Sequence, residues 1–197
     1  MGCVSSTFLR EGDQPKFSKQ YCRIVKRYLP NFIFVEPSNN DDRLVAFAHW
    51  EQTYKDTIHS EKTAADSAVG KLYAAFYEHL FEHAAQLKPL FQASHAVQSR
   101  VLTHISTGMK SLLSSEDLVQ KVMHLALVHM KIGVKADDFD PLGEALIQAM
   151  KKTTGAAWTE RIELAWRRIY CHAAILILVN IPNVHIDLDD FKDDPAT

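Results

Sequence analysis

A histidine that closes an apolar helical stripe is the residue of this chain best placed to do chemistry. The stripe repeats at spacings of four, three and four residues, so its members share one face of a helix: Leu118, Val122, Leu125 and His129. Gly133 follows, and a glycine in a left-handed conformation can end a helix and turn the chain. The imidazole of His129 would then extend from a rigid helix towards whatever covers the stripe.

A second helical face lies about thirty residues earlier in the chain, and it is polar at one end and apolar below. Its members are Gln98, Leu102, Ile105 and Met109. Two helices that present such faces to each other could enclose a flat apolar ligand such as haem. Spacing alone leaves a second interpretation open, in which His129 is a core histidine whose ring nitrogens are satisfied by neighbouring groups.

The first six residues suggest covalent lipid attachment. They fit the myristoylation pattern, in which Gly2 becomes the N-terminus and a hydroxyl residue stands at position 6. Cys3 is a candidate palmitoyl acceptor, and a second lipid matters because one myristoyl chain binds membranes only marginally. Six basic and two acidic residues before Tyr28 add attraction to anionic lipid. We expect attachment to the inner leaflet, at the cytoplasmic face of the plasma membrane; the alternative is an unmodified tail that matches by chance.

Composition narrows the class of protein. The chain has 197 residues, of which 47% are apolar and 23% charged, as is typical of a packed soluble domain. Its net charge of -2 gives no general attraction to nucleic acid, so no nucleic-acid partner is expected. Cys3, Cys22 and Cys171 are far apart, which excludes a disulfide scaffold and a CxxC motif. No apolar run is long enough to span a bilayer.

Helical periodicity predicts the elements that position these residues. Residues 30–42, rich in Pro, Asn, Ser and Asp, look like a linker, and a short alternating run follows Asn31 at 32–35. One helix is expected to begin at Thr63 and another at Thr159, each with a capping residue before an apolar stripe. We therefore predict a basic extension over 1–42, an all-α domain over 43–182 and an acidic tail over 183–197.

Five segments resemble the globin family, in order and at about globin spacing. They are residues 76–81, 87–91, 125–134, 143–146 and 165–170. The stretch from Tyr77 to Phe91 is most similar to the globin domain of flavohaemoglobins and their single-domain relatives, and the acylated start resembles membrane-attached globins such as globin X. The resemblance implies the globin fold, a three-on-three helical sandwich, and a haem b (iron protoporphyrin IX).

The resemblance also assigns site residues. It makes His129 the proximal haem-iron ligand, and it makes Phe91 the phenylalanine that packs on the haem face. Tyr77 falls where many such globins have a distal tyrosine, whose hydroxyl can donate to bound dioxygen; the alternative is a core tyrosine satisfied elsewhere. Gln98 is the first choice for the main distal residue, whereas counting back from His129 without a gap places Val97 there.

Other positions complete the predicted pocket or depart from the family pattern. Leu102 and Val134 are expected to form its apolar cage, together with Phe91. Flavohaemoglobins polarise the proximal imidazole through a Tyr and Glu pair, and the corresponding positions here are Phe139 and, approximately, Ile181. Phe139 is thus expected to contact the cofactor without that polarising effect. The chain ends before a flavin or nicotinamide domain, so a reductase would be a separate protein.

These features predict a haem-binding globin that binds dioxygen, carbon monoxide or nitric oxide reversibly, in redox or signalling work at a membrane surface. One alternative is an enzyme, a nitric oxide dioxygenase or nitrite reductase that uses an external reductase. A second alternative is a haem-based gas or redox sensor that reports its ligand state through the basic extension.

Overall fold

Helices form every regular element in the part of the chain that the computed structural model describes, which is residues 16–54, 67–92, 133–181 and 184. The α-helices are α1 (Lys19–Tyr28), α2 (Asn40–Tyr54), α3 (Ala68–His83), α4 (Lys88–Gln92), α7 (Phe139–Thr154) and α8 (Glu160–Leu178). Short 3₁₀ turns stand at Ala85–Leu87, Ala136–Asp138 and Gly155–Ala157. The predicted all-α class is confirmed. None of the described helices is long and apolar enough to cross a membrane.

Side-chain caps decide where two of these helices begin. The Thr159 hydroxyl accepts a hydrogen bond from the Ile162 N–H at 3.2 Å, so α8 begins where the sequence predicts. The start of α3 differs from the prediction at Thr63. The Ser67 hydroxyl accepts from the Gly70 N–H at 2.9 Å, and α3 begins at the next residue. Thr63 itself lies outside the described residues.

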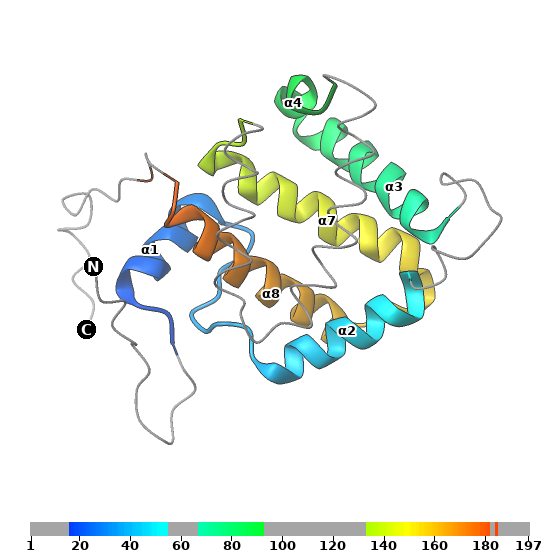
Figure 1. The fold of residues 1–197 in the computed structure, drawn as a ribbon, viewed down its shortest axis with the longest axis horizontal. Helices are drawn as coiled ribbons and strands as arrows, with labels where there is room; N and C mark the ends of the chain where they lie inside the picture. Colours follow the sequence, from blue (N-terminus) through cyan, green and yellow to red (C-terminus); the bar gives the residue numbers. More distant parts are fainter. Residues whose placement is uncertain (1–15, 55–66, 93–132, 182–183, 185–197) are drawn as a thin grey trace.

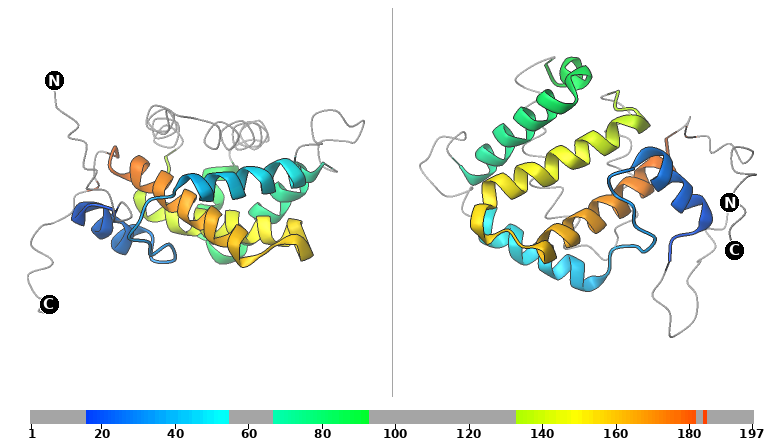
Figure 2. Two further views of the ribbon diagram at one scale, coloured as in Figure 1. Left: turned by 90° about the horizontal axis from the view of Figure 1, so that it is seen from below. Right: turned by 180° about the vertical axis from the view of Figure 1, so that it is seen from behind.

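The helices pack in pairs (Figure 1). α3 lies along α7, α2 lies along α8, and α7 and α8 run beside each other after the turn at Gly155. The two further views in Figure 2 show the same neighbours from below and from behind. Bulky side chains fill the space between them, and the largest of the fully buried ones include Trp166, Phe32, Ile24, Leu72, Ile147 and Met150.

A glycine permits the close approach of α7 and α8. A Cβ atom at Gly143 would stand 2.3 Å from Cε1 of Tyr170 and 2.7 Å from Cζ of Phe32. The Tyr170 hydroxyl donates to the Phe139 carbonyl at 2.5 Å, which fixes its ring across α7. Aromatic rings therefore occupy the space that a larger residue at position 143 would need.

The segment around α1 shares this core. Ile24, Leu29 and Phe32 are at most 1% exposed. The Asn31 backbone N–H donates to Asp140 at 2.9 Å, and the Asn31 amide nitrogen donates to the same carboxylate at 2.7 Å. Residues that looked like an extension and a linker thus pack against α7 and α8.

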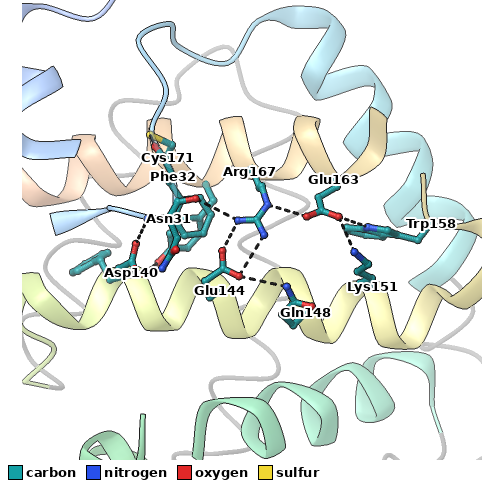
Figure 3. A network of polar contacts seen from close by, with 12 residues as sticks. Asn31, Phe32, Asp140, Glu144, Gln148, Lys151, Trp158, Glu163, Arg167 and Cys171 are labelled. Carbon is teal, nitrogen blue, oxygen red and sulfur yellow. Dashed lines mark hydrogen bonds and ion pairs between the residues drawn. The ribbon is translucent and has the colours of Figure 1, made fainter. Parts of the chain in front are cut away.

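A polar network joins α7 to α8 (Figure 3). The Arg167 guanidinium forms an ion pair with Glu144 of α7 and donates to Glu163, one helical turn away, at 3.0 Å. Glu163 also accepts from Lys151 at 3.2 Å and from the Trp158 indole N–H at 3.0 Å. The Arg167 and Glu144 side chains are about four-fifths buried, at 18% and 22% exposure, so their pairing is shielded from solvent more than that of a surface pair.

Candidate functional site

A cluster of aromatic rings surrounds Tyr77 of α3. Positions four apart share a face of a helix, so Tyr73, Tyr77 and Phe81 follow one another. The Tyr77 ring centroid lies 5.3 Å from those of Tyr73 and Phe81, with the Phe81 ring stacked on it. Phe91 of α4 also contacts Tyr77. Its ring is edge-on to the Tyr77 ring, with the two ring centroids 5.5 Å apart. The turn between α3 and α4 therefore joins two predicted site residues, Tyr77 and Phe91.

The Tyr77 hydroxyl oxygen is buried and has no hydrogen-bond partner among the groups that the structure describes. The neighbouring Tyr73 hydroxyl acts to lower the pKa of Tyr77, as a weak hydrogen-bond donor does, although their contact falls outside ordinary hydrogen-bond geometry. Burial raises the pKa of Tyr77 to about 12, so the hydroxyl keeps its proton at neutral pH and remains a donor. Buried polar groups in proteins almost always have a partner. A hydroxyl in this state fits a site that receives a polar ligand.

Val134 lies near the same end of the molecule as the ring cluster around Tyr77. Gly133 has a φ of 89°, the left-handed conformation expected of a residue that turns the chain. A Cβ at Gly133 would stand 3.7 Å from the Leu90 side chain, so this turn lies against α4. Val134 is 7% exposed and Phe91 is 6% exposed. Two residues predicted for the apolar cage are thus buried beside neighbouring elements.

Phe139 stands at the start of α7 and is 3% exposed. Its carbonyl accepts the Tyr170 hydroxyl, which ties it to α8. Ile181 is partly buried and packs against the hydrophobic core. Both positions are apolar. Their correspondence to the Tyr and Glu pair of flavohaemoglobins stays a prediction.

The remaining predicted site residues lie outside the described part of the chain, and they stay predictions. They are His129, Gln98 with its competitor Val97, Leu102, and the lipid acceptors Gly2 and Cys3. Sequence reasoning gave no role to Tyr73 and Phe81, which enclose Tyr77. Their spacing of four residues on each side of Tyr77 is the signal that could have found them.

A known protein family matches a long stretch of this chain. The model of the Globin family matches residues 74–175, more than half of the chain, from the middle of α3 to near the end of α8. The chain belongs to the globin family. The predicted globin fold is therefore confirmed, and with it the coarser functional prediction of a haem-binding globin, in a family whose members bind diatomic gases such as dioxygen.

Similar proteins come from bacteria and plants. A flavohemoprotein of Halalkalibacterium halodurans is 26% identical over 99 residues, which cover 48% of this globin and 24% of the relative. A flavohemoprotein of Vibrio cholerae is 24% identical over 60% of this globin and 31% of the relative. A protein named as an anaerobic nitrite reductase from Brassica napus is 36% identical over 28% of this globin and 35% of the relative. The globin thus spans about a quarter to a third of the length of these relatives.

The described residues fit a haem. The ring cluster offers an apolar wall, and the Tyr77 hydroxyl is a buried, protonated donor that lacks a partner in the described structure. A pocket for a flat apolar cofactor with a polar ligand on one side needs both features. His129, whose imidazole nitrogen is a suitable donor for iron, is the residue that would hold it from the other side.

Proposed function

We propose that this globin binds dioxygen or another diatomic ligand reversibly at a b-type haem, at the cytoplasmic face of a membrane, in redox or signalling work. The proposal rests above all on the buried Tyr77 hydroxyl, which has no partner in the described protein. When bound, the haem supplies the iron at which a diatomic ligand binds. Acyl chains on Gly2 and Cys3 would hold the protein at the inner leaflet, as its first six residues predict.

The residues of the chain would act on the ligand through polarity and exclusion of water. Tyr77 donates a hydrogen bond to the outer atom of a polar diatomic ligand, and its raised pKa keeps the proton in place. Gln98 would supply a second donor to the ligand. Phe91, Leu102 and Val134 would surround the cofactor with apolar side chains and keep water away. His129 would hold the iron.

The test of the cofactor assignment is His129→Ala in the full chain. We expect the variant to lose haem, seen as loss of the Soret absorption in the ferric, ferrous and carbonyl forms, and to melt at a lower temperature. His124→Ala, which changes a histidine on a different predicted helical face, is the matched control and should keep both. A normal haem content in His129→Ala would show that the proximal assignment is wrong.

A second candidate function is catalytic: nitric oxide dioxygenation or nitrite reduction with electrons from a separate reductase. The relatives favour it, because they include flavohemoproteins and a protein named as an anaerobic nitrite reductase. Turnover of nitric oxide or nitrite by the haem-loaded protein, with a chemical reductant, separates this candidate from reversible binding. Turnover no faster than that of free haem would reject the enzyme.

A further inference from the structure

The segment after α1 exposes two large apolar side chains. Residues 32–35 alternate in burial around a tight turn, in which the Phe34 N–H donates to the Phe32 carbonyl at 2.9 Å. Phe32 is fully buried and Phe34 is partly buried against the core, whereas Ile33 is 72% exposed and Val35 is 55% exposed. Ile33 has the largest exposed fraction of the large apolar side chains in the described structure. The alternation therefore has a buried side and an outward apolar side.

Basic residues lie next to this apolar side. The Phe17 N–H donates to the Val35 carbonyl at 2.8 Å, which brings the start of the described chain beside the segment. Lys16 and Lys19 flank Phe17 and are exposed. α1, which begins at Lys19, contains no acidic residue. An exposed apolar pair bordered by lysines has the composition of a surface that rests on anionic lipid.

The surface is rigidly attached to the globin. Phe32 packs against Tyr170 with ring centroids 4.9 Å apart, and its carbonyl accepts from the Cys171 thiol at 3.3 Å. Phe17 packs edge-on to His172 at 5.7 Å. Both anchors join the segment to α8, so the orientation of Ile33 and Val35 relative to the helices is fixed.

We propose that Ile33, Val35, Lys16 and Lys19 form a lipid-contact surface that lies on an anionic bilayer. The inference rests on the proposed membrane attachment, which explains how the surface meets lipid. Twelve residues separate Cys3 from Lys16, and even a fully extended chain of that length spans only about 40 Å. Acyl chains on Gly2 or Cys3 would therefore hold this surface within reach of the bilayer.

The lipid-contact surface would orient the globin. α1 lies beside α8, and α7 separates α8 from α3 and α4, so the Tyr77 cluster is on the far side of the molecule from α1 (Figure 1). Contact through residues 16–35 then places α3 and α4 away from the lipid. The Tyr77 cluster would then face the aqueous phase, where soluble ligands and an electron-donating partner can reach it.

The test uses the haem-loaded full chain, myristoylated but carrying Cys3→Ser, because a single acyl chain binds reversibly and small changes in partitioning can be measured. On vesicles of phosphatidylcholine with phosphatidylserine, Ile33→Ser/Val35→Ser should reduce the partition coefficient by roughly ten- to hundredfold. Lys16→Gln/Lys19→Gln should reduce it by about thirtyfold on these vesicles and leave it unchanged on pure phosphatidylcholine.

Leu164→Ser is the matched control. Leu164 is 37% exposed and is the fifth residue of α8, whose opposite end lies beside α1. Its replacement should not change partitioning. Equal partitioning of wild type, the serine double variant and this control would overturn the lipid-contact surface but leave acylation standing. Failure of the wild type to bind vesicles would overturn both. A wild-type dimer that the serine double variant converts to a monomer would show that a second copy covers the surface, and that the proposal is wrong.

Discussion

A single hydroxyl group has the most direct bearing on ligand binding. The Tyr77 oxygen is buried and unpaired in the described structure, within a cage of aromatic rings. An unsatisfied buried donor costs stability unless a ligand accepts its hydrogen bond. The same unpaired donor therefore favours a ligand whose outer atom carries negative charge, such as dioxygen, over the less polar carbon monoxide.

Tyr77→Phe tests this role, since it removes the donor and keeps the ring. A hydrogen bond to a polar or charged acceptor contributes about 0.5–2 kcal/mol, so dioxygen release should become roughly three- to thirtyfold faster. Carbon monoxide release should change little. Stopped-flow measurement of both rates provides an internal control, and an unchanged dioxygen rate would assign Tyr77 to the core alone.

His49 is a second buried polar residue with a defined state. The Trp166 indole N–H donates to its Nδ1 at 3.0 Å, so the ring proton is on Nε2 and is donated to the Thr154 hydroxyl at 2.9 Å. Burial lowers the pKa of His49 to about 4, from an ordinary value of 6.5. The neutral imidazole is therefore the form that the folded protein holds.

Acid should destabilise the fold through this group. Between pH 6.5 and 4, His49 binds a proton in the unfolded state but stays neutral in the folded state. The free energy of unfolding therefore falls as pH falls, by up to roughly 3 kcal/mol. His172, whose pKa burial also lowers to about 4, adds to the effect. His49→Gln should be less stable at pH 7 but lose less stability towards pH 4, as denaturant unfolding at several pH values would reveal. Equal pH dependence of variant and wild type would contradict this assignment.

At the scale of elements, the packing of α7 against α8 depends on one point of close approach and on the charged groups around it. Gly143 leaves room for Tyr170 and Phe32, and the Arg167 network joins the two helices alongside (Figure 3). The same rings anchor the segment after α1. Packing at position 143 thus couples three elements, of which one lies more than a hundred residues away in the sequence.

Gly143→Ala should therefore destabilise the protein. Alanine is the better helix former by about 1 kcal/mol, but its methyl carbon would overlap Tyr170 Cε1 at 2.3 Å and the rings cannot both remain in place. Overpacking of this kind typically costs about 1–3 kcal/mol, which outweighs the propensity gain. Thermal unfolding of the haem-loaded variant measures the difference. A melting temperature at or above that of the wild type would show that the rings move aside at little cost.

At the scale of the whole molecule, the globin has two distinct sides. α3 and α4 carry the Tyr77 cluster, and α1 lies on the other side (Figure 2). The exposed pair Ile33 and Val35 belongs to the segment that follows α1. If the N-terminal residues are acylated, the first side faces water and the second faces lipid. Ligand chemistry and membrane attachment would then be separated by the packed pair α7 and α8.

Gly2→Ala tests the attachment of the whole protein. Without myristate the protein seldom meets the membrane enzymes that palmitoylate Cys3, so both anchors should be lost and the globin should move to the soluble fraction. Cys3→Ser, by comparison, should leave weak binding that salt reduces. Flotation of membranes from cells expressing each variant measures the distribution, and equal recovery of wild type and Gly2→Ala would exclude acylation as the mechanism.

The sequence by itself determined the helical class, the cap at Thr159 and the resemblance that identifies the family. These features depend on local spacing, because a helical face or a cap involves residues three or four positions apart. The resemblance, rather than the spacing, led to the prediction of Tyr77 and Phe91 as site residues. Local spacing misplaced the start of α3, since Thr63 and Ser67 are both residue types that cap helices and such spacing does not choose between them.

Only the tertiary structure decided the protonation and hydrogen-bonding states of the buried polar groups, and which apolar side chains are exposed. His49 is neutral because burial between distant elements lowers its pKa, and Trp166, 117 residues later, donates to its Nδ1. Tyr77 is an available donor because aromatic rings surround it. Periodicity at 32–35 predicted alternation, but α8 decided which side is buried and left Ile33 and Val35 outside. Contacts between distant segments depend on how complete helices pack, and the spacing of residues within one segment does not contain that information.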